Sequence, residues 1–189
     1  KELADAPSEL QALLFEQGNE VGSLAQKYFE AGHLIDEDYR NPEGALEHTD
    51  QAMKNPDFRV LFEAAFLYDN VMIRVDALRK HEDGSVDLIE VKSTNSVKKE
   101  HKDDVAVQKY VLENLGLIVQ NSYLMHLNRE YVRHGEVDIK KLFTLEELDE
   151  EIESNLEEVP TYLNLIRGKL ASEVEPDQEI GSACKSPYL

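Results

Sequence analysis

The chain has 189 residues, of which 41% are hydrophobic and 31% charged, a composition typical of one soluble globular domain with a substantial core. No apolar run approaches the roughly 20 residues that a membrane-spanning helix needs. The first residues show neither the basic start nor the apolar stretch of a secretory signal. We therefore expect a single domain over residues 1–189, cytoplasmic and without a membrane partner.

The net charge of −19 is unevenly distributed along the chain. Residues 1–58 carry 4 basic and 13 acidic side chains, residues 144–158 carry 8 acidic and no basic ones, and residues 59–143 hold 13 basic and 14 acidic ones. The acidic total argues against a broad coating of nucleic acid, because phosphate binding rewards clustered Lys and Arg. The nearly neutral middle, whose acids include candidate metal ligands, is compatible with a polyanionic substrate.

The N-terminal part, residues 1–56, is expected to be mainly helical. Apolar residues recur at helical spacing across residues 8–31, and a shorter helix is predicted over residues 43–54. The segment between them, residues 32–43, is rich in turn formers and is expected to be a loop.

Three β-rich runs follow over residues 58–93. They are separated by Asp69-Asn70 and by residues 81–84. Connections this short require antiparallel neighbours, so the segment is predicted to form a three-stranded meander.

A strand–helix–strand passage completes the predicted sheet core, residues 58–127. The helix is expected over about residues 100–115 with Gly116 as its C-terminal stop, and the fourth strand over residues 117–127. A crossover of this length predicts that the fourth strand runs parallel to a strand already in the sheet.

The C-terminal part is predicted to contain an acidic helix at about residues 142–158. Its apolar residues lie at helical spacing, and its acids are expected to form a solvated face. The tail, residues 171–189, lacks periodicity and is expected to be loosely held. Together the elements predict an α/β (α+β) fold in which helices flank a mixed sheet.

Four polar residues fall on the predicted meander in a pattern that suggests chemistry. Glu63 lies on the first strand, Asp76 near the end of the second, and Glu90 and Lys92 near the end of the third. Residues two apart on a strand share a face, so Glu90 and Lys92 are expected to point the same way. Neighbouring carboxylates repel unless a hard cation such as Mg²⁺ lies among them, and a lysine beside such an ion can orient water and stabilise phosphate charge.

The pattern D-(x)13-E-V-K from Asp76 to Lys92, followed by a helix that carries Gln108, resembles the PD-(D/E)XK nuclease superfamily. Within it the chain is most similar to the RecB-like exonucleases, including the CRISPR-associated branch, over roughly residues 15–160. The resemblance implies a restriction-endonuclease-like core that hydrolyses phosphodiester bonds of single- or double-stranded DNA. It implies Mg²⁺ or Mn²⁺ as cofactor, Lys92 and Gln108 as catalytic residues, and a metal held by Asp76, Glu90 and the carbonyl of Val91, with Glu63 assisting.

The chain departs from these relatives in three places. They often place a His four residues after a Gly in the first helix, whereas here Gly22 follows Gly18 and Gln26 follows Gly22. Glycines inside a helix usually permit close packing or the approach of a ligand. Their Gln-x-x-x-Tyr helix motif falls here on Asp104 and Gln108. An iron–sulfur cluster, which many of them bind through four cysteines, is possible only in a longer natural chain, because this one has a single cysteine near its end.

A basic cluster at the start of the predicted crossover helix is a candidate for contact with DNA phosphates. It comprises Lys98, Lys99, His101 and Lys102.

Two further functions compete with the leading hypothesis of a metal-dependent deoxyribonuclease, expected to be an exonuclease. One is a catalytically inactive nuclease fold that acts as a nucleic-acid or protein binding module, which the departures favour and the intact acidic residues oppose. The other is an acidic domain that binds basic proteins, against which the neutral middle segment argues. The sequence does not identify any protein partner.

Overall fold

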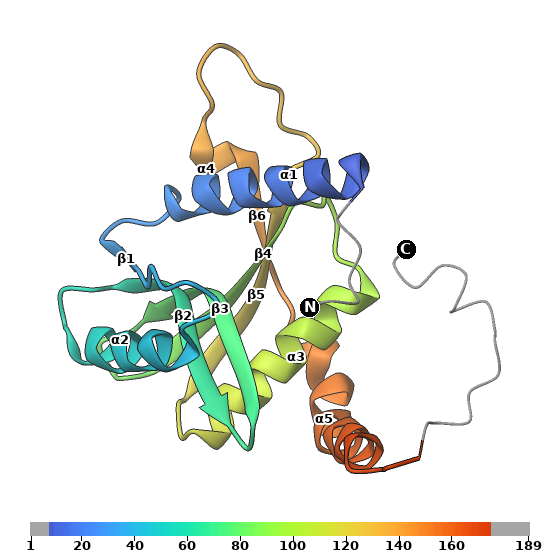
Figure 1. The fold of residues 1–189 in the computed structure, drawn as a ribbon. Coiled ribbons are helices and arrows are strands. Elements are labelled where there is room, and N and C mark those ends of the chain that lie inside the picture. Colours follow the sequence, from blue (N-terminus) through green and yellow to red (C-terminus); the bar gives the residue numbers. More distant parts are fainter. Residues whose placement is uncertain (1–7, 175–189) are drawn as a thin grey trace.

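The computed structural model describes residues 8–174, and it contains five helices and six strands (Figure 1). In chain order these are α1 (Glu9–Gln26), β1 (Gly32–Leu34), α2 (Pro42–Lys54), β2 (Val60–Tyr68), β3 (Val71–Lys80), β4 (Val86–Lys92), α3 (Lys99–Asn114), β5 (Val119–Leu127), α4 (Ile139–Leu142), β6 (Phe143–Glu147) and α5 (Asp149–Leu170). Within this part of the chain, none of the helices combines the length and apolarity needed to cross a membrane.

The six strands form one mixed sheet whose spatial order is the order of the chain, β1 to β6. Strands β2, β3 and β4 are antiparallel neighbours, and β5 pairs parallel to β4 after the α3 crossover. This confirms the predicted meander with a parallel fourth strand. The turn between β2 and β3 places Asp69 and Asn70 at φ 50° and 61°, the left-handed pair that a tight two-residue hairpin requires.

Two short strands lie where the sequence predicted something else. Residues 32–34, expected to be loop, pair in parallel with β2 as β1. Residues 143–147, expected to be helical, pair antiparallel to β5 as β6, so that prediction is wrong. The backbone groups along the edge of β5 offer partners to a short extended segment, and the helix starts only at Asp149, after which it runs to Leu170.

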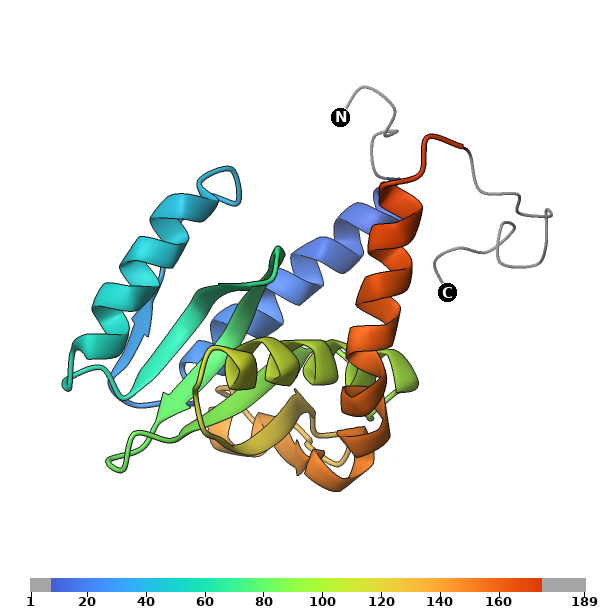
Figure 2. The same ribbon diagram turned by 90° about the horizontal axis from the view of Figure 1, so that it is seen from below.

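Helices cover both faces of the sheet, which divides the core in two. One core joins the sheet to α2, α3 and α5 and contains Leu61, Leu88, Val105, Leu112, Leu124 and Ile152. The other core joins the sheet to α1 and contains Val21, Ala25, Phe62, Ile89 and Met125. Figure 1 shows α1 running across the strands, and Figure 2 shows α3 and α5 packed against each other.

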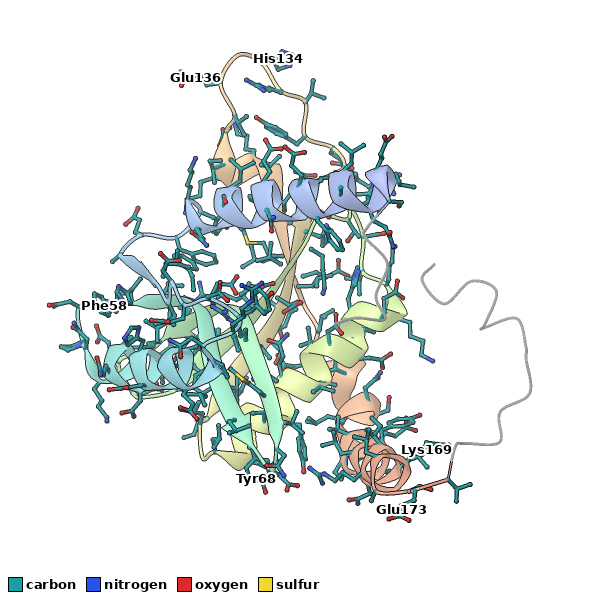
Figure 3. All side chains as sticks on the ribbon, viewed as in Figure 1. Phe58, Tyr68, His134, Glu136, Lys169 and Glu173 are labelled. Atoms are coloured by element: carbon teal, nitrogen blue, oxygen red, sulfur yellow. The ribbon has the colours of Figure 1, made fainter. Side chains whose placement is uncertain are left out.

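The β5–α4 loop, which carries His134 and Glu136, extends beyond α1, whereas the β2–β3 hairpin carries Tyr68 toward the opposite end of the molecule (Figure 3). The site described below lies between these ends. Most of the predicted tail, residues 175–189 with the single cysteine Cys184, lies outside the described residues.

Candidate active site

The site lies where the pairing between β3 and β4 ends. The last partners in that ladder are Ala77 and Ile89. Beyond them the side chain of Asp76 takes the place of the backbone, because its Oδ2 accepts a hydrogen bond from the Val91 N–H at 2.7 Å. This contact fixes the Asp76 carboxylate in the fork between the two strands.

Glu63 lies opposite Asp76 on β2, at a break in the ladder between Phe62–Ala77 and Ala64–Val75. Its φ of 56° is left-handed, which is uncommon for a residue with a side chain and costs backbone free energy. The conformation changes the face on which β2 presents its side chains, since Phe62 belongs to the α1 core and Ala64 to the core under α3. Strain of this kind, at a residue predicted to assist a metal, is typical of functional positions.

Glu90 and Lys92 lie on one face of β4, as predicted, and both contact α3. The Nζ atom of Lys92 is 2.8 Å from Glu90 Oε1 and 2.8 Å from Asp104 Oδ2. The Gln108 amide donates to the other carboxylate oxygen of Glu90 at 2.6 Å. Both oxygens of the buried Glu90 side chain are therefore engaged, which orients the carboxylate without any added ion.

The environment of the two other carboxyl groups, Asp76 and Glu63, raises their pKa values. Burial raises the pKa of Asp76 well above its ordinary value of 3.8, and the nearby charge of Glu90 raises it further. Burial also raises the pKa of Glu63, although the guanidinium of Arg74 opposes that shift. A carboxyl group with a raised folded pKa binds its proton more tightly in the folded state. Its contribution to stability is therefore greatest at low pH and is lost as the pH rises from near 4 through the folded pKa.

The carboxylates of Glu90 and Asp104 stabilise the protonated form of Lys92. Burial alone would lower the pKa of this ammonium, but the carboxylates of Glu90 and Asp104 raise it above its ordinary value. Lys92 is consequently protonated at neutral pH, so it can stabilise negative charge but cannot act as a general base.

A cleft of about 520 Å³ separates α1 from this part of the sheet, and we call it the α1 cleft. Glu63, Asp76, Val91 and Lys92 line it on the sheet side. The α1 side contributes residues that carry no charge, namely Gly18, Asn19, Gly22, Ser23 and Gln26. These four predicted site residues are thus reached from solvent beneath α1, whereas Glu90 and Gln108 do not line the cleft and contact each other on the α3 side.

The oxygen ligands of the site suit a hard divalent cation in their chemistry, but their side chains are not arranged to coordinate one. Within residues 8–174 no group of three or more His, Cys, Asp or Glu side chains is arranged to hold a metal ion. A cation bound there would compete with Lys92 for Glu90, which Lys92 contacts at 2.8 Å. Asp76 and Glu63 nevertheless supply oxygen ligands whose mutual repulsion a cation would relieve, and the buried Gln108 Oε1 has no hydrogen-bond partner within the described residues.

The predicted phosphate-binding cluster is only partly exposed at the start of α3. Lys98 and Lys99 are exposed, and Lys102 forms an ion pair with Glu151 of α5. His101 is buried, and its Nδ1 accepts a hydrogen bond from the Lys98 N–H, so it supports the start of the helix. The expectation that His101 contacts phosphate is therefore wrong for this arrangement, whereas the role of the three lysines stays a prediction.

The sequence analysis missed what Arg74 does and gave Asp104 no role beyond its place in the helix motif. Arg74 Nε lies 3.5 Å from Glu63 Oε2, and its terminal nitrogens donate to backbone carbonyls before α2, including that of Glu37 at 3.0 Å. Two simple spacings pointed to them. Arg74 precedes Asp76 by two residues on a strand, and Asp104 precedes Gln108 by four on a helix, so each lies on the face of a predicted site residue.

Comparisons with known proteins add little to this geometry. No family model matches the chain, and no curated protein matches it. A solved structure described as "Crystal structure of SSO0001" is similar at 12% identity and a TM-score of 0.30, over 78% of this chain and 88% of that one. A likeness this weak carries no argument about fold or function.

Proposed function

We propose that the chain is a divalent-metal-dependent nuclease of the PD-(D/E)XK type that hydrolyses phosphodiester bonds in DNA. The observation that carries this proposal is the meeting of Glu63, Asp76, Glu90 and Lys92 at the β3–β4 fork, beside an open cleft. Action from DNA ends, as an exonuclease, rests on the resemblance to RecB-like enzymes alone. The proposal places the enzyme in the cytoplasm, where its substrate would be.

The metal ligands proposed are Asp76, Glu90 and the Val91 carbonyl, with Glu63 assisting. Mg²⁺ or Mn²⁺ suits such oxygen ligands and, when bound, lowers the pKa of a coordinated water and offsets phosphate charge. The protein supplies the remaining functions through groups that are already in place. Gln108 holds Glu90 by one oxygen and keeps its own Oε1 free to accept a hydrogen bond from a water.

Lys92 is proposed to stabilise the negative charge that develops on the scissile phosphate. Its ammonium is anchored at two points, so it is positioned before a substrate arrives. Asp104, which is half-exposed, is the second of these two anchors. Lys98 and Lys99 are proposed to hold the phosphates of the strand nearby.

The proposal is tested by a cleavage time course on end-labelled single- and double-stranded DNA with Mg²⁺, with Mn²⁺ and with EDTA. We expect cleavage that needs the metal and that Asp76→Ala abolishes. Asp50→Ala, which removes an exposed carboxylate on α2, is the matched control and should cleave like the wild type.

Two outcomes would contradict the proposal, the first its activity and the second its site. One is the absence of cleavage on every DNA substrate with either metal, which together with retained DNA binding would favour an inactive nuclease fold. The other is full cleavage by Asp76→Ala, which would move the active site elsewhere on the molecule.

A further inference from the structure

The wall that α1 presents to the cleft differs in chemistry from the wall opposite. Asn19, Ser23 and Gln26 lie at spacings of four and three residues, and so on one face of the helix. Among the described residues that line the cleft, Lys92 is the single cation and lies on the sheet side. The α1 wall is therefore neutral but rich in hydrogen-bonding groups, which does not suit a phosphate.

The two amide side chains on this wall have free hydrogen-bonding capacity. Within residues 8–174 neither Asn19 nor Gln26 uses its side-chain amide in a hydrogen bond, while the Ser23 hydroxyl donates to the Asn19 carbonyl at 2.9 Å. An amide offers both donors and an acceptor, the combination that can pair with the edge of a nucleobase. Gln26 is half-buried, so an uncharged partner of this kind would satisfy it.

The glycines of α1 leave room in front of these amides. A Cβ atom placed on Gly18 or Gly22 would meet no heavy atom within 4 Å, so neither glycine is needed for close packing among residues 8–174. Their absent side chains instead widen the cleft. Phe29, which is half-buried, also borders the cleft and gives a flat ligand an aromatic surface, and its ring packs against that of the buried Phe62 with centroids 6.0 Å apart.

We propose that the α1 cleft contains a subsite for an unpaired nucleobase. Its edge pairs with Asn19 and Gln26, its face lies against Phe29, and its own phosphate points to Lys92. The inference rests on the proposed nuclease function and adds the part of the substrate that α1 recognises. The cleft of about 520 Å³ has the size of a small-molecule pocket, and a base within a duplex cannot present its edge there. The enzyme should therefore prefer unpaired ends to blunt duplex ends.

The test measures binding by fluorescence anisotropy, with Ca²⁺ supplied as the cation. The probes are a labelled single-stranded oligonucleotide, the same strand with abasic residues at its 5′ or its 3′ end, and a blunt duplex. We expect the wild type to bind one abasic strand and the duplex more weakly than the intact strand. The loss of a base from an aromatic surface corresponds to roughly 5- to 150-fold in affinity.

A substitution that fills the cleft should remove the same discrimination. A Cβ atom at Gly22 meets no heavy atom within 4 Å, so Gly22→Leu should fold, bind the intact strand more weakly and no longer distinguish the abasic strand. Gly168→Leu on α5 is the matched control, because a Cβ there also meets nothing within 4 Å and the residue lies outside the cleft. Gln26→Ala should give a smaller loss, and Gln17→Ala, one of the exposed positions on α1, should give none.

Equal binding of intact and abasic strands by a wild type that still cleaves DNA would overturn the base subsite and leave the nuclease function standing. Unchanged discrimination by a folded Gly22→Leu would overturn it too. If Gly22→Leu does not fold, the abasic comparison decides, because it uses the unaltered protein. No cleavage and no binding of any strand by the wild type would overturn both the nuclease function and this inference.

Discussion

Replacing Lys92 by methionine removes the ammonium and keeps most of the side-chain stem, so the change tests charge rather than packing. The free energy of unfolding should fall because Glu90 loses its ion pair. Removing one partner of a fully buried pair costs about 3–5 kcal/mol, whereas an exposed pair contributes at most about 1 kcal/mol. The side chains of Glu90 and Lys92 are 9% and 28% exposed, and that of Asp104 is 49% exposed. We therefore expect a loss of about 1–3 kcal/mol, nearly all of it from Glu90.

The effect on catalysis should exceed the effect on folding. Losing one electrostatic stabiliser of a transition state typically lowers turnover by about 10²–10³-fold. Lys92→Arg keeps the charge and should recover much of the stability, but it should recover little activity, because a planar guanidinium cannot replace a compact ammonium in this position. Mn²⁺ should bind Lys92→Met at least as tightly as the wild type, since the lysine supplies no ligand and competes for Glu90.

Urea unfolding without metal measures the unfolding free energy, cleavage of end-labelled DNA with Mn²⁺ measures turnover, and calorimetry with Mn²⁺ measures metal affinity. Lys54→Met is the control, because Lys54 also pairs with a carboxylate but is 72% exposed. It should change stability by less than about 1 kcal/mol and leave cleavage intact. Wild-type cleavage by Lys92→Met would refute the catalytic role of this lysine, and an unchanged unfolding free energy would refute the electrostatic reasoning.

Three further predictions concern the stability of variants at single positions. Asp76→Asn should stabilise the metal-free protein by about 0.5–2 kcal/mol at pH 8 and abolish cleavage. The raised pKa of Asp76 costs stability only as the pH rises, so an equal gain in the urea unfolding free energy at pH 4 would contradict this prediction. Gly22→Ala should raise the unfolding free energy by about 0.5–1 kcal/mol, and thermal melts should show a similar gain for Gly168→Ala. Thr49→Val should lower it by about 1–3 kcal/mol, because the buried Ala65 N–H loses its 2.9 Å bond to the threonine hydroxyl; an unchanged melting temperature would count against this.

Local signals in the sequence were sufficient for most of the sheet. The turn residues Asp69 and Asn70 adopt the left-handed conformation that their side chains tolerate best, and this fixes the β2–β3 hairpin. Gly116, at φ 86°, ends the crossover before β5, as its lack of a side chain allows. Taken by itself, the spacing of apolar residues around Leu145 fits a helix as well as it fits a strand. Only the neighbouring edge of β5 decides for a strand there, and that edge exists only in the folded chain.

The sequence indicated which residues could form the candidate site, but it did not indicate their hydrogen bonds or backbone conformations. Strand position alone indicated that Glu90 and Lys92 share a face, and the structure confirms this by their common contacts with α3. The capture of the Val91 N–H by Asp76 depends on where two strands part, a property of sheet twist rather than of either strand. The left-handed φ of Glu63 is likewise invisible in its sequence, because nothing in the chain there marks a residue that favours this conformation.

The sheet keeps its strands in the order in which the chain supplies them, and within the meander β2, β3 and β4 close only short loops to meet their partners, whereas β1 and β5 join it through the longer connections that contain α2 and α3. The four charged residues of the proposed site, Glu63, Asp76, Glu90 and Lys92, come from three consecutive strands, β2, β3 and β4. That meander can reach its register as a pair of nested hairpins before either covering helix docks, since contacts near in sequence form at low entropic cost. The placement of these four residues on the sheet is therefore encoded locally, whereas Asp104 and Gln108 join them only when α3 docks. Insertions in the distant β5–α4 loop should leave the site unchanged.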